Sequence, residues 1–246
     1  MCMFTENRKI RYTQLSANQT MRLADVLNFF QDAAVAHTTA CGHPLQSLYA
    51  QNSAWILLAI RVVLDSQILA EEVEVSTWPY LFSKASCNRA FSIKSPKDGR
   101  TLVDAASIWA YVDTVSGRPK EVPPAYVSMF KSIGKTPSLS CERRPTMALP
   151  ETLVSSFRVL KRDIDTNKHM NNVKYLEYAE EVLPEDFQVK EFKIHFRHAA
   201  YLGDKLFLYG MQNAEKGCVN AIFKNEAGEI CTYIQFSSQP ESEKGI

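Results

Sequence analysis

The chain has 246 residues, with 28 Lys and Arg against 27 Asp and Glu, so its formal net charge is only +1. Such a balance supplies no bulk field for holding nucleic acid or an acidic membrane. Hydrophobic residues make up 46% and charged residues 22%, which excludes disorder as the main state and allows a core for one large domain or two small ones.

Two features argue against export or membrane insertion. The first residues show no basic stretch followed by an apolar run, the pattern of a secretory signal. The most apolar stretch, residues 54–64, is too short to span a bilayer and carries Arg61. The cysteines are scattered without a Cys-x-x-Cys pair, so neither a zinc site nor a redox pair is indicated. We therefore expect a protein of the reducing cytoplasm, without a membrane span.

A long amphipathic helix is predicted near the start of the chain, over residues 21–37. Its apolar residues recur at the i, i+3, i+4, i+7 spacing of one helical face, and neither Gly nor Pro interrupts them. The members of this stripe are Leu23, Val26, Leu27, Phe30, Ala33, Ala34 and His37. Alternating segments and an Asp-Gly turn then predict an antiparallel meander. Its strands are expected at residues 55–64, 72–78, 88–93 and 102–112.

A second unit of the same design is predicted after a change in composition. Residues 130–150 are rich in Lys, Ser, Thr and Arg and are interrupted by prolines, which predicts an exposed connection. A helix over residues 171–182, stopped by Pro184, and a further meander follow. The strands of this meander are expected at residues 191–197, 205–211, 219–224 and 230–236. The pattern as a whole is α+β.

The two halves correspond at an offset of about 148 residues, which places residues 15–30 over residues 163–178. Each half then offers a strand, a short loop, a helix and a meander. We therefore predict a first domain at 1–135, a linker at 136–149 and a second domain at 150–246.

The loop that enters the second helix carries an unusual density of polar groups, among them Asp165, Asn167 and His169. At the offset above, the first half has Ala17, Gln19 and Met21 in their place. An imidazole beside a carboxylate can transfer a proton at neutral pH, and N–H groups at a helix start can polarise a carbonyl. These are the requirements of acyl hydrolysis. Asp and Asn also cap helices and form turns, which is the competing structural interpretation.

Two other chemistries fit the sequence poorly. No second His or Cys stands at ligand spacing from His169, so a metal site is not expected. No Gly-x-Ser-x-Gly elbow is present for a lipase-type triad. We expect no cofactor.

These motifs together resemble a known family. The string Asp165-x-Asn167-x-His169-x-Asn171-Asn172-x-x-Tyr175 resembles the active-site motif of the acyl-acyl-carrier-protein thioesterases, which release fatty acids from their carrier. In the first half, residues 30–37 resemble the family's first helix. Residues 77–79, 106–113 and 118–123 resemble the strands and the turn that follow it. The resemblance covers nearly the whole chain.

The resemblance implies two hot-dog domains in tandem, each a long helix wrapped by an antiparallel sheet. It implies catalysis by Asp165, Asn167 and His169 in the second domain and accommodation of the acyl chain largely by the first. One departure matters. The plant enzymes have a Glu-Cys pair on the strand after the helix, where this chain has Ala199 and Ala200. A mechanism that depends on that glutamate or cysteine cannot operate here.

We expect hydrolysis of a fatty-acyl thioester on acyl carrier protein, and leave open whether Asp165 or His169 takes the proton and whether a covalent intermediate forms. The predicted lining of the acyl chain is Leu23, Leu27, Phe30, Trp55, Leu57 and Ala59. Ala59 is expected to share the strand face of Leu57 and to look toward the long helix. Carrier protein is typically acidic, so basic residues near the linker are the docking candidates. These are Lys131, Lys135, Arg143 and Arg144.

The same sequence is compatible with three alternative functions. A hot-dog acyl-CoA thioesterase or a dehydratase would share the fold, and a non-catalytic module that binds acyl thioesters would share the apolar lining. Neither nucleic acid nor a membrane is an expected partner, and the sequence leaves a homodimer open.

Overall fold

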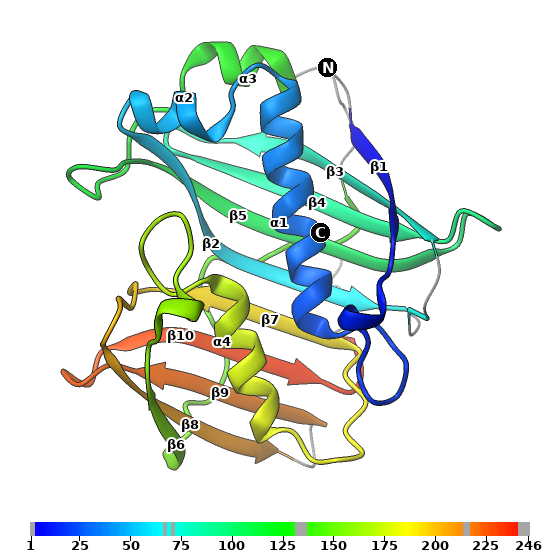
Figure 1. Ribbon diagram of the computed structural model, residues 1–246, viewed down its shortest axis with the longest axis vertical. Helices are drawn as coiled ribbons and strands as arrows, with labels where there is room; N and C mark the ends of the chain where they lie inside the picture. Colours follow the sequence, from blue (N-terminus) through cyan, green and yellow to red (C-terminus); the bar gives the residue numbers. More distant parts are fainter. Residues whose placement is uncertain (1–2, 66–67, 70–71, 131–136, 214–216, 241–246) are drawn as a thin grey trace. The chain divides into compact units, whose positions relative to one another are not determined.

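The computed structural model describes residues 3–65, 68–69, 72–130, 137–213 and 217–240 (Figure 1). The chain divides into two compact units, Met1–Cys141 and Glu142–Ile246, here called unit 1 and unit 2. Residues 142–149, which the composition assigns to a linker, cluster with unit 2.

Unit 1 is an antiparallel sheet with a long helix. Its strands are β1 (Phe4–Lys9), β2 (Ser53–Leu64), β3 (Glu72–Phe82), β4 (Ser86–Lys94) and β5 (Thr101–Asp113). Its helices are α1 (Leu23–Ala40), α2 (Leu45–Ala50) and α3 (Pro124–Phe130), with a 3-10 turn η1 at Tyr12–Gln14. The strands are ordered β1-β3-β4-β5-β2. Neighbouring strands within this order pair antiparallel.

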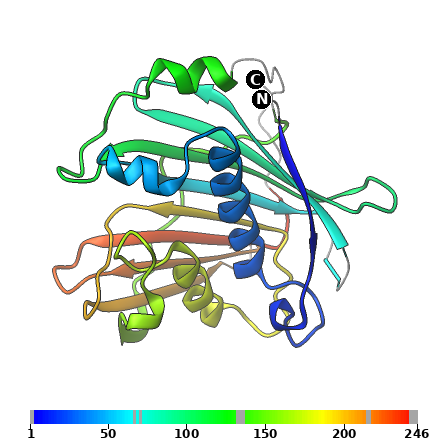
Figure 2. The same cartoon turned by 45° about the horizontal axis from the view of Figure 1, so that its top comes forward.

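Helix α1 lies across one face of this sheet (Figure 2), and its apolar stripe is buried, as the spacing predicts. Val26, Leu27, Phe30 and Ala33 are fully buried. The Phe30 ring stacks on that of Phe91 from β4, with 4.7 Å between centroids. The core of unit 1 therefore lies between α1 and one face of the sheet.

Unit 2 repeats this plan with a shorter helix. Its strands are β6 (Thr152–Arg158), β7 (Glu191–Phe196), β8 (Lys205–Asn213), β9 (Cys218–Lys224) and β10 (Ile230–Ser237). Its helix is α4 (Asn172–Ala179), flanked by the 3-10 turns η2 (Lys161–Asp163) and η3 (Glu180–Val182). The strands are ordered β7-β10-β9-β8-β6 and pair antiparallel. Tyr175 of α4 meets Phe223 of β9 edge to face, with 5.2 Å between centroids.

The α+β prediction and the predicted strands are confirmed, each within a few residues of its expected bounds. β1 and β6 are the strands expected ahead of each loop, and both lie at a sheet edge. The sequence does not predict α2 or α3, because helices of six or seven residues are too short to show a periodic stripe. No helix in the described part of the chain is long and apolar enough to cross a membrane.

Candidate active site

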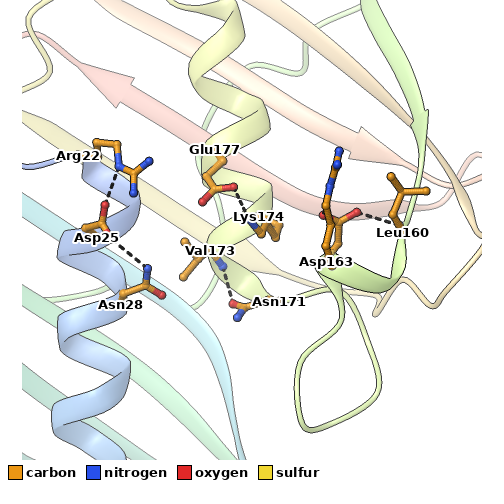
Figure 3. Close-up of polar contacts among 10 residues, drawn as sticks. Arg22, Asp25, Asn28, Leu160, Asp163, Asn171, Val173, Lys174 and Glu177 are labelled. Atoms are coloured by element: carbon orange, nitrogen blue, oxygen red, sulfur yellow. Dashed lines mark hydrogen bonds and ion pairs between the residues drawn. The ribbon is translucent and has the colours of Figure 1, made fainter. Parts of the chain in front are cut away.

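The loop that enters α4 is closed at its base by Asp163, which is buried. The Asp163 carboxylate accepts a hydrogen bond from the Leu160 N–H at 2.8 Å (Figure 3). The backbone carbonyl of Asp163 accepts one from the Asn171 N–H at 2.8 Å. A bridge between Ile164 and Met170 pairs the two arms. These backbone contacts therefore anchor the loop at both ends, independently of the side chains at its tip.

The tip of this loop is built around the carboxylate of Asp165. Its Oδ1 accepts a hydrogen bond from the Asn167 N–H at 2.8 Å, and its Oδ2 accepts one from the Asn167 side-chain amide at 3.3 Å. The Asp165 N–H donates to the His169 carbonyl at 3.0 Å, and Lys168 adopts a positive φ of 65°. Asp165 therefore shapes the turn and also faces the other two motif residues.

His169 lies beside the same carboxylate. Its Nδ1 is 3.7 Å from Oδ1 of Asp165, and the two side chains are 20% and 19% exposed. This separation is longer than a hydrogen bond, so the pair needs a small side-chain rotation to form one. Asp165, Asn167 and His169 thus lie together in one loop of unit 2, within reach of solvent.

Two N–H groups at the start of α4, those of Val173 and Lys174, are already hydrogen-bonded, which argues against the expectation that they polarise a substrate carbonyl. Asn171 is the N-cap, and its Oδ1 accepts a hydrogen bond from the Val173 N–H at 3.0 Å (Figure 3). The Lys174 N–H donates to the Asn171 carbonyl at 2.9 Å. Asn is a favoured cap for this reason. Val173 and Lys174 therefore offer no unused amide to a substrate in this arrangement.

The loop that enters α4, residues 160–171, is here called the candidate loop. Ala199 and Ala200 follow β7 and lie next to it. The Ala200 carbonyl accepts a hydrogen bond from the Met170 N–H at 2.7 Å. Ala200 is buried and Ala199 is exposed. The stretch that aligns with the plant Glu-Cys pair is thus a direct neighbour of the loop, and it contributes no titratable side chain here.

Unit 1 contains a loop of the same backbone geometry. Ser16 donates its N–H to the Thr20 carbonyl at 2.7 Å, Gln19 adopts a positive φ of 61°, and a bridge joins Leu15 to Met21. Each feature recurs in unit 2 exactly 149 positions later, so the predicted offset of about 148 is wrong by one residue.

This register changes the comparison between the two loops. The structural counterparts of Asp165, Asn167 and His169 are Ser16, Asn18 and Thr20. The unit 1 loop therefore has polar residues at these three positions, where the offset of 148 placed Ala17, Gln19 and Met21. It nevertheless lacks both the carboxylate and the imidazole. The sequence carries a weak signal for this register, because Asn18 and Met21 then match Asn167 and Met170.

The residues predicted to line an acyl chain occupy different environments. Leu27, Phe30 and Leu57 are buried, and Leu23 and Trp55 are partly exposed. Trp55 packs on Tyr111, with 5.0 Å between ring centroids. All of these contacts lie within unit 1.

The expectation for Ala59 is wrong because β2 contains a β-bulge. Leu57 pairs with Trp109, whereas Ala59 pairs with Ile108. Neighbouring residues of β5 point to opposite faces of the sheet, so Leu57 and Ala59 do so as well. Trp109 shares the face of Phe91, which α1 covers. Ala59 therefore points away from α1.

A polar cluster near the C-terminal end of α1 is not predicted by the sequence. Arg89 is only 7% exposed, its Nη1 lies 3.1 Å from His37 Nδ1, and it donates to Thr77 Oγ1 at 3.2 Å. Burial lowers the pKa of Arg89. Because arginine can only donate, a hydrogen bond here requires Nδ1 of His37 to be the acceptor. The sequence does contain a signal for such a cluster. Arg89 stands in an apolar strand, directly before Ala90 and Phe91.

Arg143 and Arg144 are exposed residues of unit 2, whereas Lys131 and Lys135 lie outside the described residues. The segment that carries the arginines is held by a hydrogen bond between His195 and the Arg143 backbone. It is also held by the Asn220 side chain, which donates to the Ala148 carbonyl at 3.0 Å.

The residues that the structure describes form neither a metal cluster nor a disulfide. Among them, no group of three or more His, Cys, Asp and Glu side chains could hold a metal ion. The described cysteines are thiols and form no disulfide.

Both halves of the chain match known families. Residues 2–130 match the acyl-ACP thioesterase N-terminal domain, and residues 147–237 match the acyl-ACP thioesterase C-terminal domain. The palmitoyl-acyl carrier protein thioesterase of Arabidopsis thaliana is 24% identical over 194 residues, which are 74% of this chain and 47% of that protein. The chain thus spans about half the length of the curated relatives it matches.

Solved structures show the same architecture along almost the entire chain. An acyl-ACP thioesterase from Bacteroides thetaiotaomicron superposes with a TM-score of 0.85 at 18% identity, covering 96% of this chain and 97% of its own. A 12:0-ACP thioesterase from Umbellularia californica gives 0.83 at 16% identity, covering 97% and 98%. The predicted tandem double hot-dog fold is confirmed by these likenesses.

Proposed function

Because this chain belongs to the acyl-ACP thioesterase family, we propose that it hydrolyses the thioester between a fatty acyl chain and acyl carrier protein and releases the free fatty acid. Matches along both halves of the chain support this proposal. The observation that carries it is the loop in which Asp165 holds Asn167 and stands beside His169.

We assign the general base to His169 and the orienting role to Asp165. Both carboxylate oxygens of Asp165 already accept hydrogen bonds from Asn167, which leaves them less suited to take a proton from water. A carboxylate beside Nδ1 of His169 favours the orientation in which Nε2 accepts the proton, and it stabilises the imidazolium that results.

The reaction then proceeds in two steps. The oxygen of water attacks the thioester carbonyl carbon while His169 takes one proton from that water. The tetrahedral intermediate next collapses with cleavage of the carbon–sulfur bond, and the imidazolium returns the proton to the sulfur of the phosphopantetheine arm. The products are a fatty acid and a thiol. Only water is consumed, so the proposed chemistry needs neither a metal nor a cofactor.

Asn167 is assigned to positioning the carbonyl and the water. Its bond to Asp165 sets the plane of its side-chain amide, which is a donor of the type that stabilises a developing oxyanion. The backbone N–H groups of Val173 and Lys174, which are already hydrogen-bonded to Asn171, have no role in this proposal. A covalent route through Ala199 or Ala200 is excluded by their side chains.

The two halves of the chain are assigned different roles. We propose that residues 150–246 form the catalytic domain and that residues 1–135 form a non-catalytic domain for the acyl chain, joined by residues 136–149. The buried layer under α1 supports the second assignment, since it is apolar over most of its length. The proposed lining consists of Leu23, Leu27, Phe30, Trp55 and Leu57.

Docking of the carrier is assigned in part to the linker arginines. Arg143 and Arg144 are exposed and would attract an acidic partner. Lys131 and Lys135 complete the proposed cluster from the sequence. We also propose a cytoplasmic location. Light scattering of the purified protein tests the homodimer that the sequence leaves open.

The deciding experiment offers acyl carrier protein and coenzyme A carrying the same panel of acyl chains. Faster hydrolysis of the carrier-bound chains supports the proposal, and the His169→Ala variant shows that the turnover comes from this loop. Preference for acyl-CoA would make the chain a hot-dog acyl-CoA thioesterase. Enoyl products would indicate a dehydratase, and binding without turnover would indicate a non-catalytic module.

A further inference from the structure

A turn formed by residues 200–204 is bonded to the candidate loop and to the end of β6. The Ala200 carbonyl accepts the Met170 N–H at 2.7 Å, at the point where the candidate loop meets α4. On its other side, the Gly203 N–H donates to the Val159 carbonyl at 2.9 Å. The turn is therefore a fixed neighbour of the loop that we propose to be catalytic.

Large apolar side chains are exposed on this turn and on the segment bonded to it. Tyr201 and Leu202 are 56% and 55% exposed, and Leu160, which follows Val159, is 44% exposed. We call Leu160, Tyr201 and Leu202 the turn patch. Exposed apolar side chains gathered on neighbouring segments are typical of interaction sites, whereas single ones are ordinary.

Beyond the two linker arginines, the exposed basic residues of unit 2 gather around the turn patch. Between residues 150 and 240, the exposed Lys and Arg of the described chain are Arg158, Lys161, Arg162, Lys168 and Arg197. All of them lie on the end of β6, on the candidate loop or just ahead of the turn. Residues 150–246 as a whole hold 12 Lys and Arg against 15 Asp and Glu. The basic surface therefore runs against the charge balance of its own unit.

The acidic residues of the same segments accept hydrogen bonds from the backbone of those segments. Asp163 and Asp204 each accept a backbone N–H of a turn-patch residue at 2.8 Å, and Asp165 closes the tip of the candidate loop. The acidic residues Glu226 and Glu229 are exposed in the separate β9–β10 turn. The charged side chains that face solvent beside the turn patch are therefore mainly positive.

We propose that the turn patch, with the basic residues around it, is a docking surface for an acidic carrier protein. This proposal rests on the function proposed above and adds a second contact to the linker arginines. Complementary charges speed encounter and fix the orientation of the partner, while the apolar side chains supply a central contact. A carrier seated on this turn would bring its thioester arm to the neighbourhood of His169.

An anionic membrane surface is the competing partner for this surface, because it too attracts basic and apolar side chains. The turn patch is a poor membrane anchor by comparison with an amphipathic helix, which inserts a long apolar face. A compact partner such as a carrier protein fits a patch of three side chains better. Vesicle binding is therefore included in the test as the outcome that would overturn the proposal.

The test uses two variants, Lys161→Glu and Leu202→Ser, each with a matched control elsewhere in unit 2. Lys190→Glu makes the same charge change outside the basic surface. Leu153→Ser removes a leucine that is 53% exposed on β6, close to the 55% of Leu202. Neither test residue belongs to the proposed catalytic set, so turnover of a small acyl thioester without carrier should stay unchanged in all four variants.

The main measurement is titration calorimetry with carrier protein that bears no acyl chain. We expect Lys161→Glu and Leu202→Ser to weaken carrier binding by about fivefold to tenfold, and the controls to stay within about twofold. High salt should abolish the difference caused by Lys161→Glu and leave that of Leu202→Ser, because salt screens exposed charges only.

Two outcomes would overturn the proposal. Carrier binding that is equal in the patch variants and in the wild type would remove the docking role. Co-sedimentation with phosphatidylglycerol vesicles that depends on Lys161 and Leu202, while carrier binding does not, would assign the surface to a membrane. The proposed function fails separately, if the wild-type protein binds carrier through the patch yet hydrolyses no acyl thioester.

Discussion

Thr20 holds in the loop of unit 1 the position that His169 holds in the loop of unit 2. Each follows a residue of positive φ, and each accepts a backbone hydrogen bond through its carbonyl from the residue four positions earlier. Because the two backbones agree, the loops differ chemically only through their side chains. Every variant in the candidate loop therefore has a matched control within the same protein.

The first prediction compares these two positions. His169→Ala should lower kcat on acyl carrier protein by about a hundredfold or more, since a single general base contributes that much. Thr20→Ala should leave kcat within about twofold. Steady-state kinetics with both variants, each shown to be folded by circular dichroism, makes the comparison. Near-normal turnover of the His169 variant would remove it from the proposed mechanism.

Asp165→Asn tests the orienting carboxylate without removing the turn. The asparagine keeps one oxygen to accept the Asn167 N–H, so the loop should retain its shape. It removes the negative charge that favours the imidazolium of His169, so kcat should fall by about a hundredfold. Ser16→Ala is the control in unit 1. If Asp165→Asn lost its folded near-ultraviolet spectrum along with its activity, the residue would be structural.

Ala105 replaces Ala59 as the position that tests acyl-chain length. Ala105 is buried on β5, where it pairs with Val62 of β2 and Phe91 of β4 on the face that α1 covers. Ala105→Leu should take room from the far end of a chain held there. Each buried methylene is worth about 0.8 kcal/mol, so losing two or three should slow the longest substrate roughly tenfold or more.

Ala59→Leu is the control for this change, because it adds the same bulk on the opposite face of the sheet. Overpacking can lower the melting temperature of either variant. Only Ala105→Leu should shift the preference toward shorter chains in a chain-length profile. A uniform fall across all chain lengths would mean that Ala105 does not line the site.

His195 predicts how stability depends on pH. Burial lowers the pKa of His195 below its usual 6.5, and Lys193 and Arg197 act in the same direction, while Glu142 and the Arg143 backbone oppose them. Below about pH 6.5 the unfolded chain therefore binds a proton that the folded chain refuses. The stability that the neutral form provides is complete above that pH and is lost as the pH falls toward the lower, folded value.

His195→Phe should remove this part of the acid sensitivity. Melting temperatures of wild type and variant, measured in steps from about pH 7.5 to about pH 5, should fall less steeply for the variant. His198→Phe serves as the control, because His198 is exposed. Parallel curves for wild type and His195→Phe would show that another group dominates the acid response.

The sequence by itself determined the elements and the motif, because both depend on local spacing. The stripe from Leu23 to His37 dictates a buried helix, since every third or fourth residue falls on one side. The loop of Asp165 and His169 is likewise local, because the carboxylate bonds a backbone N–H two residues away.

Only the tertiary structure decided which partner each residue meets. The face of Ala59 depends on a bulge that appears only when β2 pairs with β5. The turn patch depends on hydrogen bonds that join Met170 to Ala200 and Gly203 to Val159. Hydrogen bonds between segments distant in the chain are set by packing, and no local pattern of residue types encodes them.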